Sequence, residues 1–147
     1  MTDSSHDPQP SGAEVGRRVV HRRYVPYSHT HYAGNLVDGA YSLGLFGDVA
    51  TEMCIVTDGD EGLFASYDDV QFLAPVRAGD VLEISCELTR VGARSRRLSF
   101  AVHVVARGAA TSERPGAAGV LEPPIVATTA TGTVVVPGRP AGPSDGA

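Results

Sequence analysis

Apolar and polar positions along the chain predict one strand, one long helix and then four further strands. Residues 17–27, with the sequence RRVVHRRYVPY, alternate loosely, as a strand does. Residues 36–54 carry apolar side chains at helical spacing and predict the helix. After the turn TDGDEG, four segments predict strands, over residues 63–76, 80–92, 94–107 and 125–136.

The predicted helix combines the pattern of a buried element with residues that weaken helices. Asn35 is a suitable N-cap, and Asp38 three residues later completes a pattern like a capping box. One apolar stripe comprises Leu36, Ala40, Leu43, Gly47, Ala50 and Cys54. Further apolar side chains fall outside this stripe, which indicates a helix that is buried almost all round.

Glycines inside this helix predict how it packs. Gly44 and Gly47 each destabilise a helix interior by roughly 1 kcal/mol relative to Ala. Close packing of the helix backbone against a sheet would compensate for this loss. We therefore expect an α+β fold, in which an antiparallel sheet of about five strands wraps around one long central helix.

The chain of 147 residues is long enough for one domain, which we place at residues 17–136. Residues 1–16 and 137–147 are rich in Pro, Gly, Ser and Asp, and we expect both tails to be disordered. A Pro- and Gly-rich loop is expected at about residues 108–124.

Composition excludes several classes of function. All 12 basic residues are Arg, so a lysine Schiff base and a phosphate-binding P-loop lysine are excluded. The net charge of -5 argues against general nucleic-acid binding. Without an apolar run of transmembrane length, and with two cysteines that form no disulfide framework, the sequence predicts a cytoplasmic protein with no membrane partner.

Four motifs give the chain a family resemblance. They are HYAGNLVDGA, LFGDVATE, DGDEGLF followed by a tyrosine, and FLAPVRAGD with VGARSR. Between about Tyr24 and Arg107 the chain resembles the hotdog fold of acyl-CoA thioesterases and dehydratases, and within it the 3-aminobutyryl-CoA and β-alanyl-CoA ammonia lyases. This resemblance implies a homodimer or higher homo-oligomer that binds an acyl-CoA substrate between subunits. It also implies no cofactor other than the CoA of the substrate.

Elimination of ammonia from a 3-aminoacyl-CoA needs a base at C2, stabilisation of the enolate and a site that tolerates a cation. Backbone N–H groups of Gly39 and Ala40 at the helix start are expected to bind the thioester oxygen. We expect Glu61 to act as the base and Asp48 to pair with the ammonium or to exchange roles with Glu61. His31 is expected to hydrogen-bond the substrate or a carboxylate.

Two arginines are candidates for CoA binding. Strand alternation places Arg94 and Arg96 on one face, where they would meet CoA phosphates or form a solvated strand end. No metal site is expected, because His29 and His31 have no third ligand nearby.

Two alternatives to the lyase remain open. In an acyl-CoA thioesterase the same carboxylate would activate water to attack the thioester carbonyl. A non-catalytic module would bind acyl-CoA and leave both bonds intact.

Overall fold

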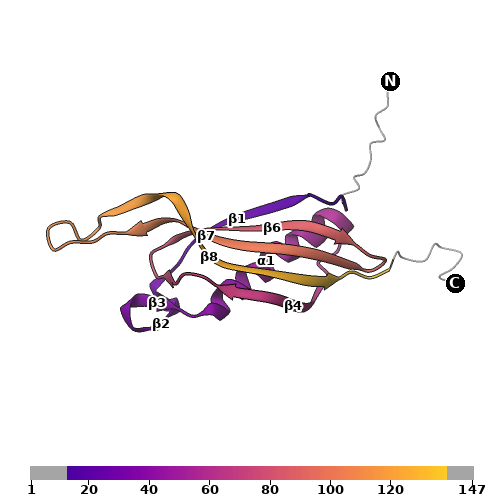
Figure 1. The fold of residues 1–147 in the computed structure, drawn as a ribbon, viewed down its shortest axis with the longest axis horizontal. Coiled ribbons are helices and arrows are strands. Elements are labelled where there is room, and N and C mark those ends of the chain that lie inside the picture. Colours follow the sequence, from indigo (N-terminus) through magenta and orange to yellow (C-terminus); the bar gives the residue numbers. More distant parts are fainter. Residues whose placement is uncertain (1–12, 139–147) are drawn as a thin grey trace, which may run out of the picture.

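The computed structural model describes residues 13–138, in which a single α-helix packs on a five-stranded antiparallel sheet (Figure 1). The helix α1 spans Gly39–Asp58. The sheet order is β1 (Arg18–Tyr24), β6 (Val81–Val91), β7 (Ser95–Gly108), β8 (Ala118–Val135) and β4 (Leu63–Phe72). The expected α+β architecture, one long helix with a five-stranded antiparallel sheet, is confirmed. The two predicted tails lie almost wholly outside the described residues.

A small second sheet lies at the starting end of the helix (Figure 1). It has the order β2 (Thr30–Tyr32), β3 (Leu36–Val37) and β5 (Val76–Arg77). Short 3-10 turns at Tyr27–His29 and Ala33–Asn35 connect the first segments. This sheet places the residues before the helix beside the segment that follows β4.

The helix begins later than expected. Leu36 and Val37 are extended and pair with β5, and Asn35 has a φ of 62°, so Asn35 does not cap the helix. Asp38 is the N-cap instead, and its Oδ1 accepts a hydrogen bond of 3.1 Å from the N–H of Tyr41. The helix also ends later, at a left-handed Gly59.

Only one face of α1 is buried, so the expectation of burial all round is wrong. The buried side chains are Ser42, Leu45, Phe46, Val49, Ala50, Met53 and Cys54. They pack on the inward positions of the sheet, such as Leu82, Ile84 and Phe100. Their spacing of three and four residues follows the helical period, but the stripe is rotated from the predicted one.

The two helix glycines do not pack on the sheet. A Cβ atom built at Gly44 or Gly47 would meet no described atom within 4 Å. The expected compensation through close packing is therefore wrong for a single chain. The side of α1 that carries Gly44 and Gly47, which we call its open side, is not covered by the described chain.

Strands β7 and β8 extend beyond the rest of the sheet as a hairpin arm (Figure 1). Ala106, Arg107 and Gly108 pair with Val120, Gly119 and Ala118. The expected loop at 108–124 is thus shorter, because strand pairing continues through much of this segment.

A buried ion pair fixes the loop that leads into β6. Asp80 is fully buried, and Arg107 donates to its Oδ1 from Nε at 2.9 Å and to its Oδ2 from Nη2 at 2.8 Å. Nη2 of Arg107 also donates to the carbonyl of Pro75 at 3.0 Å. The hydrogen bonds to Asp80 raise the pKa of Arg107. The segment between Pro75 and Asp80 is thereby held beside the helix start.

Candidate active site

A pocket of about 440 Å³ opens at the start of α1, and we call it the start pocket. Its lining residues are Tyr32, Val37, Asp38, Gly39, Ser42, Phe72, Leu73, Ala74, Pro75, Val76 and Thr128. They come from the small sheet, from the helix start, from the end of β4 and the segment after it, and from β8. Mostly apolar walls with a few polar groups are typical of a small-molecule site.

Free backbone donors face this pocket from the helix start. An α-helix leaves its first N–H groups without intrahelical partners, and Asp38 takes the N–H of Tyr41. The N–H groups of Gly39 and Ala40 remain available, at the positive end of the helix dipole. Gly39 lines the pocket, while Ala40 is exposed beside it. Such donors are suited to an oxygen that gains negative charge.

Phe72 lies directly against Gly39. A Cβ atom at Gly39 would be 2.7 Å from Cζ of Phe72, closer than Cβ atoms approach other atoms. The ring is nevertheless 58% exposed, so its outer part forms a wall of the pocket. A side chain at position 39 would therefore have to displace the ring of Phe72 from this wall.

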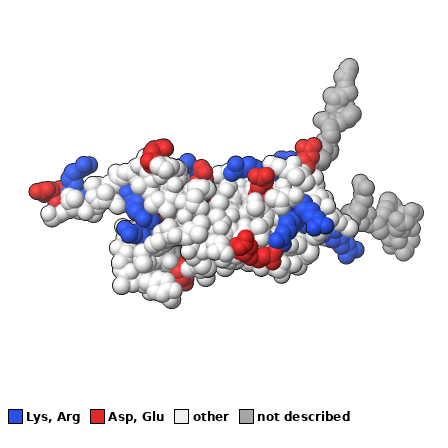
Figure 2. Space-filling view, in the orientation of Figure 1, with Lys and Arg blue, Asp and Glu red and all other residues white. Residues whose placement is uncertain are grey.

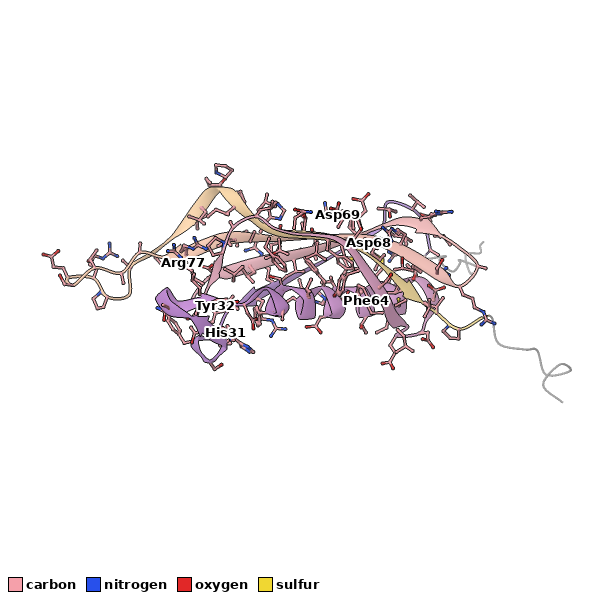
Figure 3. All side chains as sticks on the ribbon, turned by 60° about the horizontal axis from the view of Figure 1, so that its bottom comes forward. His31, Tyr32, Phe64, Asp68, Asp69 and Arg77 are labelled. Carbon is pink, nitrogen blue, oxygen red and sulfur yellow. The ribbon has the colours of Figure 1, made fainter. Side chains whose placement is uncertain are left out.

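His31 is near a carboxylate at the pocket's rim. Its Nδ1 is 3.8 Å from Oδ2 of Asp38, too far for a hydrogen bond but close enough for an ion pair when the imidazole is protonated. The ring packs edge-on against Tyr32, with 4.6 Å between centroids. Figure 3 shows His31 and Tyr32 together at the end of the molecule where α1 begins.

A second pocket, of about 310 Å³, contains both of the predicted catalytic carboxylates, and we call it the carboxylate pocket. It is lined by Gly47, Asp48, Ala50, Thr51, Glu61, Gly62, Leu63, Phe64 and Val134. Asp48 and Glu61 are exposed there. Oδ2 of Asp48 is 3.3 Å from Nη2 of Arg23, and both side chains are about half exposed, so this ion pair is weak and exchangeable.

The predicted site residues do not meet within one chain. Gly39 lines the start pocket and Asp48 the carboxylate pocket, and Asp48 lies nine positions after Gly39, which is roughly 14 Å along the helix axis. Strand β4 connects the two pockets: Leu63 at its beginning lines the carboxylate pocket, and Phe72 at its end lines the start pocket. Figure 3 shows Phe64 well away from His31 and Tyr32.

Arg96 is not available for CoA phosphates. It is only 6% exposed, and it donates to Asp58 from Nε at 3.0 Å and from Nη2 at 2.6 Å. Its Nη1 donates to the carbonyls of Gly92 and Ser95. The expectation that it binds CoA is therefore wrong, since its donors are used within the chain. The prediction from strand alternation failed because the side chain of Arg96 lies on the inner face of the sheet.

Arg94, the second arginine predicted to bind CoA, is exposed. Its side chain lines a groove of about 640 Å³ together with Glu61 and Leu63. Figure 2 shows acidic and basic side chains interspersed on the viewed face, with no continuous basic strip across it.

Sequence reasoning missed most of the residues that line the start pocket, among them Ser42, Phe72 and Thr128. Ser42 lies four residues after Asp38, which is the helical spacing that could have placed it on the pocket side. Phe72 and Thr128 pair across β4 and β8, a register that the sequence alone does not give.

Among residues 13–138, no three His, Cys, Asp or Glu side chains are clustered as metal ligands would be. No helix of the described chain is long and apolar enough to cross a membrane.

Comparisons with known proteins agree with this architecture. Residues 34–110 match the family model of the thioesterase superfamily. A 3-aminobutyryl-CoA ammonia lyase from Acetoanaerobium sticklandii is 52% identical over 109 residues, which are 73% of this chain and 84% of that protein.

Solved structures give the same result. The β-alanyl-CoA:ammonia lyase from Clostridium propionicum superposes with a TM-score of 0.80 and 36% identity, over 89% of this chain and 94% of that one. An acyl-CoA hydrolase from Staphylococcus aureus, in complex with butyryl coenzyme A, shares the fold with a TM-score of 0.62 and 18% identity, over 81% of this chain and 62% of that one. The chain therefore belongs to the thioesterase superfamily and, within it, to the family of 3-aminobutyryl-CoA and β-alanyl-CoA ammonia lyases.

Proposed function

We propose that this protein is an ammonia lyase that converts a 3-aminoacyl-CoA, such as 3-aminobutyryl-CoA or β-alanyl-CoA, reversibly into the enoyl-CoA and ammonia. The family membership supports the reaction class. The observation that carries the chemistry is the start pocket, which Gly39 lines at the helix start and which has both apolar and polar walls. This arrangement is suited to a thioester whose oxygen becomes negatively charged.

We further propose that two subunits complete each site by pairing along β4. Within the described chain one edge of β4 has no partner strand, and Leu63 and Phe72 at its two ends are 73% and 58% exposed. Exposed edges of this kind favour edge-to-edge association. Antiparallel pairing of β4 with its own copy would bring Leu63 of one subunit opposite Phe72 of the other. The carboxylate pocket of one subunit would then face the start pocket of its partner.

In the proposed reaction Glu61 of one subunit removes the proton from C2 of a substrate bound in the partner's start pocket. The electron pair is delocalised onto the thioester oxygen, where the N–H groups of Gly39 and Ala40 stabilise it. The C2–C3 double bond forms, the C3–N bond breaks, and nitrogen leaves as ammonia with the bonding electrons. Asp48 faces the substrate ammonium or exchanges roles with Glu61, and His31 is proposed to orient Asp38 or the substrate.

Three further points belong to this proposal. Arg94 is proposed to contact CoA phosphates from the groove beside Glu61. The reaction is proposed to need no metal or organic cofactor, because its chemical steps require only a base and hydrogen-bond donors. A cytoplasmic location is supported by the two cysteines, Cys54 and Cys86, which are buried free thiols.

Amination of crotonyl-CoA tests the function and separates it from the alternatives. The purified protein is incubated with crotonyl-CoA and ¹⁵N-labelled ammonia, and the thioesters are analysed by mass while free thiol is measured. We expect labelled 3-aminobutyryl-CoA and no thiol. Thiol release without amination would instead indicate a thioesterase, and an unchanged thioester would indicate a binding module.

A further inference from the structure

Two buried hydroxyl groups form the floor of the start pocket. Ser42 comes from α1 and Thr128 from β8, and each residue is only 2% exposed. Both line the pocket. Oγ1 of Thr128 donates to Oγ of Ser42 across 3.4 Å, which is long for a hydrogen bond between hydroxyls. Both groups line the pocket and keep hydrogen-bonding capacity beyond this one long bond.

The position of these hydroxyls is unusual for the inner layer of this fold. The neighbouring positions that face inward are apolar, including Leu45 and Phe46 on the helix and Ala130 and Val134 on β8. Burial of a hydroxyl in such a layer is unfavourable unless the group finds a polar partner. A long bond between the two hydroxyls is a poor mutual partner, and this indicates that a polar ligand group completes their hydrogen bonding.

The chemistry of the leaving group fits a pair of neutral hydroxyls. An alkylammonium can only donate hydrogen bonds, whereas free ammonia also has a lone pair that accepts one. In the transition state that lone pair faces C3, so a hydroxyl oxygen binds the nitrogen by accepting a hydrogen bond from one of its N–H groups, and it can do so for the ammonium and for ammonia. A carboxylate such as Asp48 attracts the charged ammonium when the substrate binds, whereas the neutral hydroxyls can still hold the nitrogen after its positive charge is lost.

We propose that Ser42 and Thr128 form an amine subsite that holds the nitrogen of the substrate as it leaves, and that binds ammonia in the reverse reaction. This inference rests on the proposed lyase function. In this proposal the hydroxyl pair selects substrates that carry nitrogen at C3. The carboxylates act on the C2 proton and on the charge of the substrate's ammonium group.

The reverse reaction tests the subsite, because ammonia and crotonyl-CoA can be varied independently. We expect Ser42→Ala and Thr128→Val each to raise KM for ammonia by about ten-fold, the ordinary effect of one lost hydrogen bond. KM for crotonyl-CoA should stay within about two-fold. Thr128→Ser keeps the hydroxyl and should keep the wild-type KM for ammonia.

Thr129→Val is the matched control. Thr129 pairs with Ala101 on the outer side of the same strand, so the same chemical change there should alter neither KM. Melting temperatures are measured first; Ser42→Ala introduces the best helix former, so it provides a folded variant if Thr128→Val does not fold.

A KM for ammonia that is unchanged in Ser42→Ala, or equal rises of both KM values, would overturn the subsite. Failure of the wild-type protein to aminate crotonyl-CoA at all would be the failure of the proposed function, and the subsite would fall with it. If the wild-type protein aminates crotonyl-CoA but the variants keep its KM for ammonia, the subsite is overturned and the proposed function is not.

Discussion

Arg96 and Asp58 form a bidentate ion pair that joins the end of α1 to the beginning of β7. Burial alone would raise the pKa of Asp58, but hydrogen bonds from Arg96 and Thr57 and the charge of Arg96 outweigh it and lower the pKa from its ordinary value of 3.8. The pair therefore contributes stability that is present above pH 3.8 and is lost as the pH falls through the lowered pKa.

We expect Arg96→Met to reduce the free energy of unfolding by about 3 kcal/mol at pH 7, because it leaves a partly buried carboxylate unpaired. In this variant burial raises the pKa of Asp58, because its ion-pair partner is gone. The difference in free energy of unfolding between wild type and variant should therefore become smaller at acid pH. Urea unfolding at pH 7 and at pH 4 measures both effects. Arg22→Met is the control, since the ion pair of Arg22 with Glu83 is exposed and should contribute less than about 1 kcal/mol. Equal losses in the two variants would contradict a structural role that is specific to Arg96.

Gly39→Ala should affect activity more than stability. The ring of Phe72 is an exposed and movable side chain, so it can turn away from a new methyl group, and the free energy of unfolding should change by less than about 1 kcal/mol. The displaced ring and the methyl group narrow the start pocket, and kcat/KM should fall by about ten-fold or more. The double variant Gly39→Ala with Phe72→Ala should recover some of this loss, because the two residues are in contact. Additive losses would show that the contact does not shape the site.

Glu61→Gln keeps the shape of the side chain and removes the base. If Glu61 takes the C2 proton, kcat should fall by roughly 10²-fold or more while KM for the CoA ester changes little. Asp48→Asn should mainly raise KM for the 3-aminoacyl-CoA, with less effect on the enoyl-CoA. Glu87→Gln, on the outer side of β6, is the matched control and should react at the wild-type rate. Wild-type turnover by Glu61→Gln would exclude this residue as the base.

Gly47 lies on the open side of α1, and its substitution tests that observation. Since no described atom would meet a Cβ at Gly47, the Gly47→Ala subunit should be folded and should be stabilised by up to about 1 kcal/mol through helix propensity. Circular dichroism during heating measures this. A loss of several kcal/mol would show that the helix is wrapped more closely than the single chain indicates.

The order of strands and helix could be predicted because each element carries its own local pattern. In β6 the buried residues Leu82, Ile84, Cys86 and Leu88 alternate with more exposed ones, as the sequence pattern requires. The helix start was misplaced because Leu36 and Val37 are apolar and continue the helical pattern, while their pairing with β5 depends on residues about 40 positions away.

The site was less predictable, because its contacts join distant segments of the chain. Asp58 lies 38 positions from Arg96, and Ser42 lies 86 positions from Thr128. The sequence pattern could identify Asp48 and Glu61 as carboxylates with no obvious structural role, and the structure places both in one pocket. The sequence pattern could not show that, within a single chain, this pocket is separate from the helix start.

Subunit mixing tests the central claim, that the helix start of one subunit works with Glu61 of the other. Glu61→Gln and Gly39→Val chains are each expected to have little activity alone. After co-refolding in equal amounts, half of the pairs are mixed and each has one intact site, so activity should return to roughly a quarter of the wild-type value. Activity that stays at the level of the separate variants would contradict the shared site and would place both groups within one chain.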